Sequence, residues 1–364
     1  MRRVRRKGLA LLLSGVVIAA CAGGGGSEST SAESSDELAA ADSADPFERL
    51  VAAAQDEGSV VFYTAEADEV LQAYARGFED AYGIEVVFQA LTQGPMQERL
   101  AQEFQAGRVQ ADVAGNTLDL AWNGGAAEEG HLAELTEAEL PNLAAVPDEH
   151  KSEHWVINRV LPIGVFYNTD LVDAAELPDT LEALADMTEW KGRVAIPSPE
   201  LGGSIHEWHY RLLQELGEER YEPFINRLVG DLDAVVSGSV SALAAQVGAG
   251  ELYALIGLGS TVTVPAINAG APAAIYYPEP VTVYRSSLQV LVDGPHPNAG
   301  KLFVDWLVSE EGARASCGTG VCAPPHIDVE GQIEFPETAE SVDGVEARQV
   351  GDEYVNGLVQ AASN

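Results

Sequence analysis

The chain is predicted to fold as an α/β protein with two lobes. In its first half, apolar runs with high β propensity alternate with amphipathic helical segments, which is the order that builds a parallel sheet with helices on its faces. The same alternation returns in the second half. About 320 residues follow a polar N-terminal stretch, and this is more than one hydrophobic core usually serves. Each lobe is therefore expected to hold a mixed, mainly parallel sheet flanked by helices.

The first half contains three predicted strands and two predicted helices. The strands are the β-rich runs at 59–63 and 84–88 and a third run beginning at 111. One helix between them carries Val70, Tyr74 and Phe78 at a spacing of four. The other opens at Gly94-Pro95, presents Met96, Leu100 and Phe104 on one face, and ends at Gly107.

The second half repeats this pattern. Strands are predicted at 164–167, 192–196, 234–236 and 252–256, and helices at 204–216 and 240–247. The apolar region 252–277 is interrupted every few residues by Gly, Pro or Asn. It is therefore predicted to form buried strands and turns, and not a membrane span.

The N-terminus has the pattern of a targeting segment. Four arginines and a lysine within the first seven residues precede an apolar stretch at 9–20, which is too short to cross a bilayer. Ile18-Ala19-Ala20-Cys21 resembles the bacterial lipobox, which implies a signal peptide at 1–20 and acylation of Cys21. A Gly/Ser/Glu/Ala-rich run at 21–46 would then be a flexible tether. We expect an extracytoplasmic protein anchored by lipid; an uncleaved anchor or a plain signal with a chance cysteine are the alternatives.

The charge balance excludes some partners. The chain has 57 acidic and 20 basic side chains, with a formal net charge of −37. Such a surface repels nucleic acid and anionic lipid, so neither is expected as a partner and membrane contact is expected through the lipid alone. The acidic surplus is hypothesised to be an adaptation to a saline medium, in which screening removes the self-repulsion.

The two remaining cysteines are close in sequence. Cys317 and Cys322 are separated by Gly-Thr-Gly-Val, and a near pair outside the cytoplasm is typical of a disulfide that closes a small loop. A metal site would need more ligands, and only His326 is near.

Candidate ligand contacts follow the predicted strands, because ligands of parallel sheets bind beyond the carboxyl ends of the strands. Small and hydroxyl side chains recur there. They also suit turns and helix caps, yet a cleft lined by amide N–H groups and hydroxyls fits a small polar or anionic ligand. The candidates are Thr64, Ala65 and Glu66; Thr92, Gln93 and Gly94; Asn116 and Thr117; Gly202, Gly203 and Ser204; and Gly259 and Ser260.

Several stretches resemble the type II periplasmic substrate-binding proteins of ABC transporters, in the branch of ferric-iron, aminoethylphosphonate and phosphosugar receptors. They span residues 58 to about 326 and include Val61-Phe62-Tyr63-Thr64, Tyr82-Gly83-Ile84-Glu85-Val86, Tyr167-Asn168-Thr169-Asp170-Leu171 and Trp190-Lys191-Gly192-Arg193-Val194. The resemblance implies two lobes closing about a two-segment hinge. Lobe 1 would be 47–163 plus 284–328, lobe 2 would be 164–283, and 329–364 would be a C-terminal extension with a helix whose packing stays open.

The same resemblance implies a function without catalysis. The expected protein is a monomeric receptor that delivers its ligand to an ABC permease, with no cofactor. Leu201-Gly202-Gly203-Ser204 matches the family's anion-binding helix start, and Tyr277 is a further candidate contact. The expected ligand is a small organic phosphate, phosphonate or carboxylate.

Two alternatives to this ligand class remain open. A ferric receptor needs a carboxylate, for which Glu66 is the candidate, and a tyrosine pair. The family's tyrosine positions hold Gly259 and Ser260 here, so Fe(III) would require a shifted site at Tyr276 and Tyr277. The alternative from another class is an extracellular enzyme on the same fold; against it, the chain shows no Ser/His/Asp signature, no free nucleophilic Cys and no cleft lysine.

Overall fold

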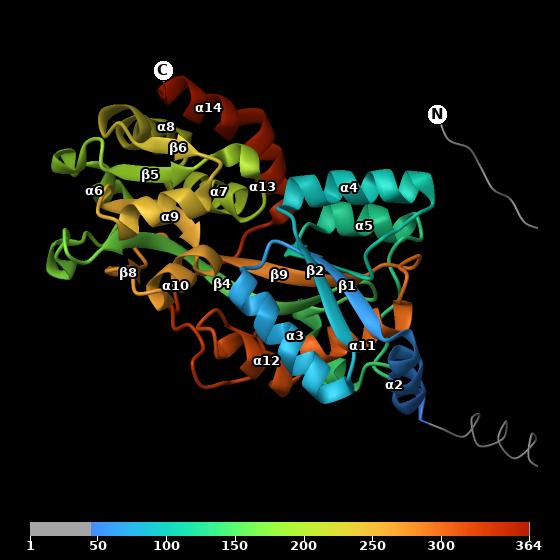
Figure 1. Cartoon of the computed structure of the whole chain (residues 1–364). Helices are drawn as coiled ribbons and strands as arrows, with labels where there is room; N and C mark the ends of the chain where they lie inside the picture. The colour runs from blue at the N-terminus through green and yellow to red at the C-terminus, as the bar shows by residue number, and fades with distance from the viewer. Residues whose placement is uncertain (1–44, 364) are drawn as a thin grey trace, which may run out of the picture. The chain divides into compact units, whose positions relative to one another are not determined.

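The structure, a computed structural model, describes residues 45–363 (Figure 1). The predicted signal peptide, Cys21 and all of the predicted tether except its last two residues lie outside this range. Within 45–363, no helix is both long and apolar enough to cross a bilayer.

One mixed sheet of nine strands runs through this unit, in the order β2-β1-β3-β9-β4-β7-β5-β6, with β8 paired to β4. β1 pairs in parallel with β2 and β3, and β5 pairs in parallel with β6 and β7, while every ladder involving β4 or β9 is antiparallel. The predicted α/β class is confirmed. The strands are β1 (Ser59–Thr64), β2 (Glu85–Ala90), β3 (Val113–Thr117), β4 (Val156–Asn168), β5 (Val194–Pro197), β6 (Val235–Ser237), β7 (Ala254–Gly259), β8 (Ala273–Tyr276) and β9 (Thr282–Val290).

Two long strands, β4 and β9, join the two halves of the sheet. β4 pairs with β9 from Val156 to Ile163, and from Ile163 onward it pairs with β7. Each ladder is interrupted once near this point. Asn158 is an extra residue in β4 opposite β9, and Gly257 is an extra residue in β7 opposite β4. Gly257 has φ of +79°, and Trp208 packs so closely on it that a Cβ would lie 2.8 Å from the ring.

The helices of the first lobe cover both faces of β2-β1-β3. On α3, Tyr74 and Phe78 face the core, and the Phe78 ring packs edge-on against Phe303 and at a tilt against Trp306 of α11, with 5.0 and 5.7 Å between ring centroids. The elements are α2 (Pro46–Glu57), α3 (Asp68–Tyr82), α4 (Gln93–Ala106), α5 (Leu120–Glu128), η1 (Pro141–Ala145), η2 (Asp148–His150), α11 (Pro297–Leu307) and α12 (Glu310–Cys317).

The second lobe surrounds β7-β5-β6. Its longest helix, α7, buries Trp208, Leu212 and Leu216 at the predicted spacing of four. The elements are η3 (Ala174–Glu176), α6 (Leu181–Ala185), η4 (Thr188–Trp190), η5 (Pro199–Leu201), α7 (Ser204–Leu216), α8 (Glu218–Ile225), the π-helical turn η6 (Asn226–Asp231), α9 (Val240–Gly248) and α10 (Ser260–Asn268).

One prediction for this lobe is wrong. The region 252–277 does not consist of strands and turns alone, because α10 lies between β7 and β8 with Pro265 inside it. The helix packs Val262, Ala266 and Ile267 against a buried cluster formed with α9 and β7. Tertiary packing therefore outweighs the helix-breaking tendency of the proline.

The C-terminal residues return to the second lobe. They form α13 (Gly344–Val350), the π-helical turn η7 (Gly351–Val355) and α14 (Asn356–Ala362). Figure 1 shows this red segment running beside α8 and down between α7 and α4. We call residues 339–362 the C-terminal strap.

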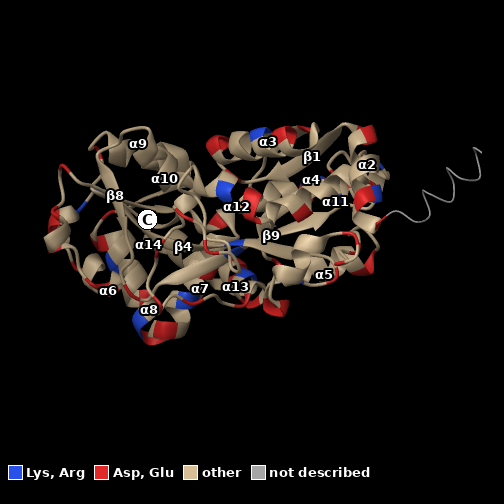
Figure 2. Cartoon of the chain, turned by 90° about the horizontal axis from the view of Figure 1, so that it is seen from below, with Lys and Arg blue, Asp and Glu red and all other residues tan. Residues whose placement is uncertain are grey.

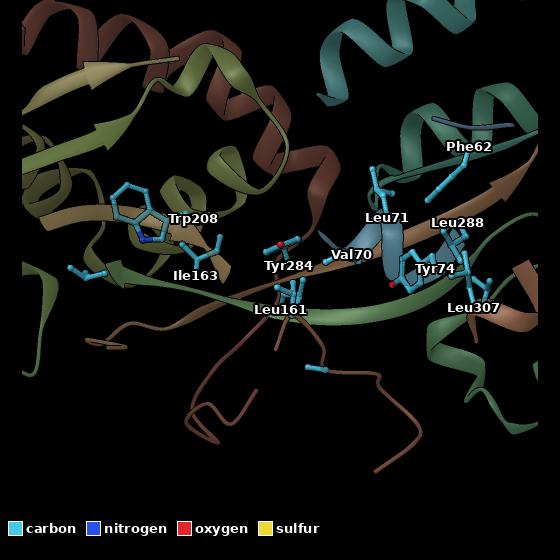
Figure 3. Close-up of a cluster of buried hydrophobic side chains, with 14 of the residues drawn as sticks. Phe62, Val70, Leu71, Tyr74, Leu161, Ile163, Trp208, Tyr284, Leu288 and Leu307 are labelled. Carbon is cyan, nitrogen blue, oxygen red and sulfur yellow. The ribbon is translucent and has the colours of Figure 1, made fainter. Parts of the chain in front are cut away.

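The hydrophobic core follows β4 and β9 from one lobe to the other. Figure 3 shows Trp208 and Ile163 at one end, Leu161 and Tyr284 in the middle, and Leu288 toward the first lobe. These side chains belong to one contiguous buried cluster. The two crossover strands are therefore held by packing as well as by backbone hydrogen bonds.

The predicted cysteine pair lies at the end of α12. Cys317 and Cys322 are buried at disulfide-bonding distance, with their Cα atoms 4.7 Å apart. The loop between them contacts α10, where Asn268 donates a hydrogen bond of 2.7 Å to the carbonyl oxygen of Thr319. In Figure 2, Asp and Glu positions are marked on helices of both lobes, among them α2, α3 and α8.

Candidate ligand site

A cavity of about 120 Å³ lies where β3, α4, α7 and the C-terminal strap meet. Five predicted contacts line it: Gln93, Gly94, Thr117, Gly202 and Gly203. The first three come from the first lobe and the two glycines from the second. The structure thus brings residues more than 80 positions apart into one interlobe site.

The glycine wall of this cavity is the start of α7. Gly202 and Gly203 have φ of +68° and +58°, which side chains rarely adopt, and Gly203 is the N-cap residue without a capping side chain. A Cβ on Gly203 would lie 2.7 Å from Oε1 of Gln93 in the opposite lobe. That Oε1 atom is buried and has no hydrogen-bond partner. The N-terminus of α7 therefore approaches the first lobe through backbone alone, with the positive end of the helix dipole at the cavity.

The buried side chains of the lining carry little net charge. Burial raises the pKa of Glu207 to about 8, so this carboxyl is protonated at neutral pH, and burial lowers the pKa of His206 so that the ring is neutral. Asp119 is 3% exposed and forms an ion pair with Arg348, 2.9 Å from Nη1 to Oδ2. Oε2 of Glu207 has no hydrogen-bond partner. A protonated carboxyl here can donate a hydrogen bond to a ligand oxygen.

A second group of predicted residues gathers at the crossover strands. Glu66 forms an ion pair with Arg159 of β4, whose side chain is 2% exposed. Nε and Nη1 of Arg159 and Oε2 of Glu66 have no hydrogen-bond partner. Burial lowers the pKa of Arg159 to about 10, which leaves the guanidinium charged at neutral pH. Arg159 is therefore a buried cation that is paired with Glu66 and keeps N–H groups without a partner.

Around Arg159, other predicted residues are buried. Arg159 interacts electrostatically with Tyr284 of β9, and the Tyr284 ring packs on Gly259, where a Cβ would lie 2.8 Å from Cε1. Ser260 is 2% exposed and its Oγ has no partner. Thr64 is buried, and its Oγ1 accepts a hydrogen bond of 3.3 Å from the Glu66 amide.

The other predicted contacts lie outside the cavity. Ala65 and Thr92 are exposed, and Ser204 begins α7 without lining the cavity. Asn116 points into the first lobe, where it contacts Met96 and accepts a hydrogen bond of 3.5 Å from Ser287.

The residues of the ferric alternative are engaged elsewhere. Glu66 is paired with Arg159, Tyr277 packs against Gly164, and the Tyr276 ring lies 5.8 Å from that of Tyr167. Burial raises the pKa of Tyr277 to about 12 and that of Tyr276 further, which disfavours the phenolate form. Among residues 45–363, no three His, Cys, Asp or Glu side chains gather as a metal site would require.

Sequence reasoning missed part of the cavity lining. Gln97 follows Gln93 by one helical turn, so the helix prediction could have found it. His206 and Glu207 lie in the first turns of α7, and neither is among the predicted contacts. Gly344 and Arg348 come from the strap, and no local signal connects them to residues more than 200 positions earlier.

The expectation that the chain shows no Ser/His/Asp arrangement is wrong. The chain does bring Ser, His and Asp together: Ser59 Oγ lies 3.1 Å from His296 Nε2, and His296 Nδ1 lies 3.0 Å from Asp112 Oδ2. Asp112 also accepts hydrogen bonds from the amides of Val61 and His296 at 2.7 and 2.5 Å. The series resembles a catalytic triad in its order of contacts.

The contacts around Ser59, His296 and Asp112 are those of a structural hydrogen-bond network. The nearby N-terminus of α11 would be the natural source of oxyanion donors, but Glu57 already accepts hydrogen bonds from the amides of Asn298 and Ala299, at 3.3 and 2.7 Å. Ser59, Asp112 and His296 therefore tie β1, the residue before β3 and the N-terminus of α11 together.

The comparisons with known proteins identify the class. Residues 112–342 match the family of bacterial extracellular solute-binding proteins, and the chain belongs to this family. The family is one of binding proteins, and membership implies a location outside the cytoplasm. No curated protein matches the chain by sequence.

Solved structures agree on the fold. The substrate-binding protein of an ABC transporter from Agrobacterium tumefaciens has a TM-score of 0.72 and 16% identity, covering 84% of this chain and 96% of its own. Iron-bound HitA from Pseudomonas aeruginosa has a TM-score of 0.62 and 21% identity, with 81% and 98% covered. AfuA from Actinobacillus pleuropneumoniae, solved with fructose-6-phosphate, has a TM-score of 0.63 and 20% identity, with 84% and 97% covered.

Proposed function

We propose that this solute-binding protein is the receptor of an ABC importer and captures a small anion, either an organic phosphate, a phosphonate or a carboxylate. The observation that carries the proposal is the interlobe cavity at the N-terminus of α7, lined by Gly202, Gly203 and Gln93. Ligand would bridge both lobes and stabilise the closed form, which the permease recognises. In this proposal the protein binds and releases its ligand without changing it chemically.

Electrostatics supports an anion despite the acidic surface. The dipole of α7 would contribute roughly 0.3–2 kcal/mol to the binding free energy of an anion. Each hydrogen bond to the charged group would contribute roughly 1.5–3 kcal/mol more. Among the acidic residues of the lining, Glu207 is protonated and Asp119 is paired with Arg348, while Glu200 and Asp352 are exposed to solvent. More distant surface carboxylates are screened by salt.

Ferric iron with a synergistic anion is the competing ligand, since iron-bound HitA shares the fold. The pairing of Glu66 with Arg159 and the raised tyrosine pKa values favour the anion alone. An iron-loaded protein with tyrosinate ligands would absorb visible light, so the spectrum after ferric loading distinguishes the two.

A charge placed in the cavity tests the proposal. Gln93→Glu adds a carboxylate of nearly the same shape at the first position of α4, where the helix dipole favours it, so the fold should keep its stability. The control Gln105→Glu makes the same change on the same helix, on its exposed side. Binding of inorganic phosphate, 2-aminoethylphosphonate, glucose 6-phosphate and citrate is measured by calorimetry.

We expect Gln93→Glu to weaken binding of the preferred anion at least tenfold and Gln105→Glu to leave it within twofold. Equal affinities in both variants would place the ligand elsewhere. Stronger binding of a cation by Gln93→Glu would overturn the assignment of an anion.

A further inference from the structure

The C-terminal strap forms one wall of the candidate ligand site. It begins at the crossover, where Glu340 forms a parallel bridge with Thr282 at the start of β9 and exchanges backbone hydrogen bonds of 3.1 and 3.0 Å with Val281 and Val283. The carbonyl oxygen of Val342 accepts a hydrogen bond of 3.4 Å from Arg285 of β9. The strap therefore starts at the hinge itself.

The strap is anchored on the second lobe. α13 packs along α7, and Gly351 lies so close to the ring of His206 that a Cβ would overlap it. Tyr354 donates a hydrogen bond of 2.8 Å to Glu222 of α8. Because His206 lines the cavity, the glycine at 351 lets the strap lie directly against the cavity wall.

The strap also reaches the first lobe, and it does so through Arg348. Nη1 of Arg348 donates to Asp119 Oδ2 at 2.9 Å and to Gln97 Oε1 at 3.4 Å. Gly344 lies against the carbonyl oxygen of Leu118, where a Cβ would be 2.8 Å away. The strap thus contacts both lobes beside the cavity.

Arg348 is the one Lys or Arg among the residues that line this cavity. Its side chain is 50% exposed, and both of its hydrogen bonds to the first lobe use Nη1. A guanidinium carries five N–H donors in a planar fork that matches carboxylate and phosphate oxygens. Nε of Arg348 lies 3.9 Å from Oδ2 of Asp352, so the donors at Nη2 are the ones that can serve an anion held at the N-terminus of α7.

We propose that Arg348 is a specificity residue of the ligand site: it pairs with the anionic group of the ligand from a strap that lies across both lobes. This inference rests on the proposed function and assigns part of the site to the C-terminal segment. Ligand recognition would then depend on three parts of the chain, namely the two lobes and the strap.

The test compares four proteins by calorimetry with the same four anions, and by thermal unfolding without ligand. Arg348→Gln removes the cation. Arg348→Gln with Asp119→Asn removes both members of the ion pair, so that Asp119 is not left as an unpaired buried carboxylate; the exposed Asp352 is present in both variants. The matched control Arg220→Gln removes an arginine of similar exposure, 58%, which is paired with Glu182 on the second lobe.

We expect Arg348→Gln to weaken anion binding 10- to 100-fold, the double variant to stay equally weak, and Arg220→Gln to bind within twofold of the parent. Recovery of affinity in the double variant would show that Arg348 only neutralises Asp119. Unchanged affinity in Arg348→Gln would show that Arg348 does not contact the ligand. Either result overturns this inference and leaves the proposed function standing. A parent protein that binds none of the anions would instead overturn the proposed function, and the inference with it.

Discussion

The buried carboxyl of Glu207 should make the stability of the protein depend on pH. Its pKa is raised from 4.5 to about 8 in the folded state, mainly by burial. Between these two values the unfolded chain releases the proton and the folded protein keeps it, so folding stability falls as pH rises. With about 1.4 kcal/mol for each pKa unit, this carboxyl should cost about 4 kcal/mol between pH 5 and pH 8.5.

Glu207→Gln keeps the shape of the side chain and removes the titration. Denaturant unfolding without ligand should give similar stabilities for variant and parent at pH 5, and an advantage of about 4 kcal/mol for the variant at pH 8.5. Glu215→Gln, which changes an exposed carboxyl on the same helix, is the control for loss of a surface charge. If the difference between Glu207→Gln and the parent stayed constant with pH, Glu207 would not be a carboxyl kept neutral by burial.

Two further predictions concern residues outside the cavity. Burial lowers the pKa of His209 from 6.5 to about 3, so between these values the unfolded chain binds a proton that the folded protein does not, and folding stability falls as pH falls. His209→Gln can still hydrogen-bond Tyr221, and in the same unfolding assay its stability relative to the parent should rise by about 3 kcal/mol between pH 7.5 and pH 4. Parallel stability curves for variant and parent would contradict this prediction. Cys317 and Cys322 should give no free thiol in denatured, unreduced protein, and replacing both by Ser should cost about 2 kcal/mol for so short a loop. Two titratable thiols would refute the predicted bridge.

Of the described elements, seven of the nine strands and the helices α3, α4, α7 and α9 could be predicted from local sequence. The bounds of α7 agree with the prediction, because glycines flank a run with apolar residues four apart. The length of β4 was missed: its 13 residues belong to two lobes, and Pro162 in its middle suggests a break. α10 was missed because its stability comes from burial against α9 and β7, which a single segment does not reveal.

The candidate site was predictable to the extent that it follows parallel strands. Gln93, Thr117 and Gly203 lie at strand ends, and the fold brings them to one edge. Asn116 lies at a strand end as well, but alternation along β3 turns its side chain inward. Arg348 joins Asp119 across 229 positions, a contact set by how the C-terminus packs and by no local pattern.

The two extra residues in the central ladders have a mechanical consequence. Asn158 and Gly257 stand on either side of Ile163, so the hydrogen-bonding register is already relaxed on both flanks of the point where β4 changes partners. The sheet can bend at such irregular positions without breaking the regular backbone hydrogen bonds of the ladders. A movement of one half of the sheet against the other would then pivot on the regularly paired segment of β4 between Arg159 and Gly164.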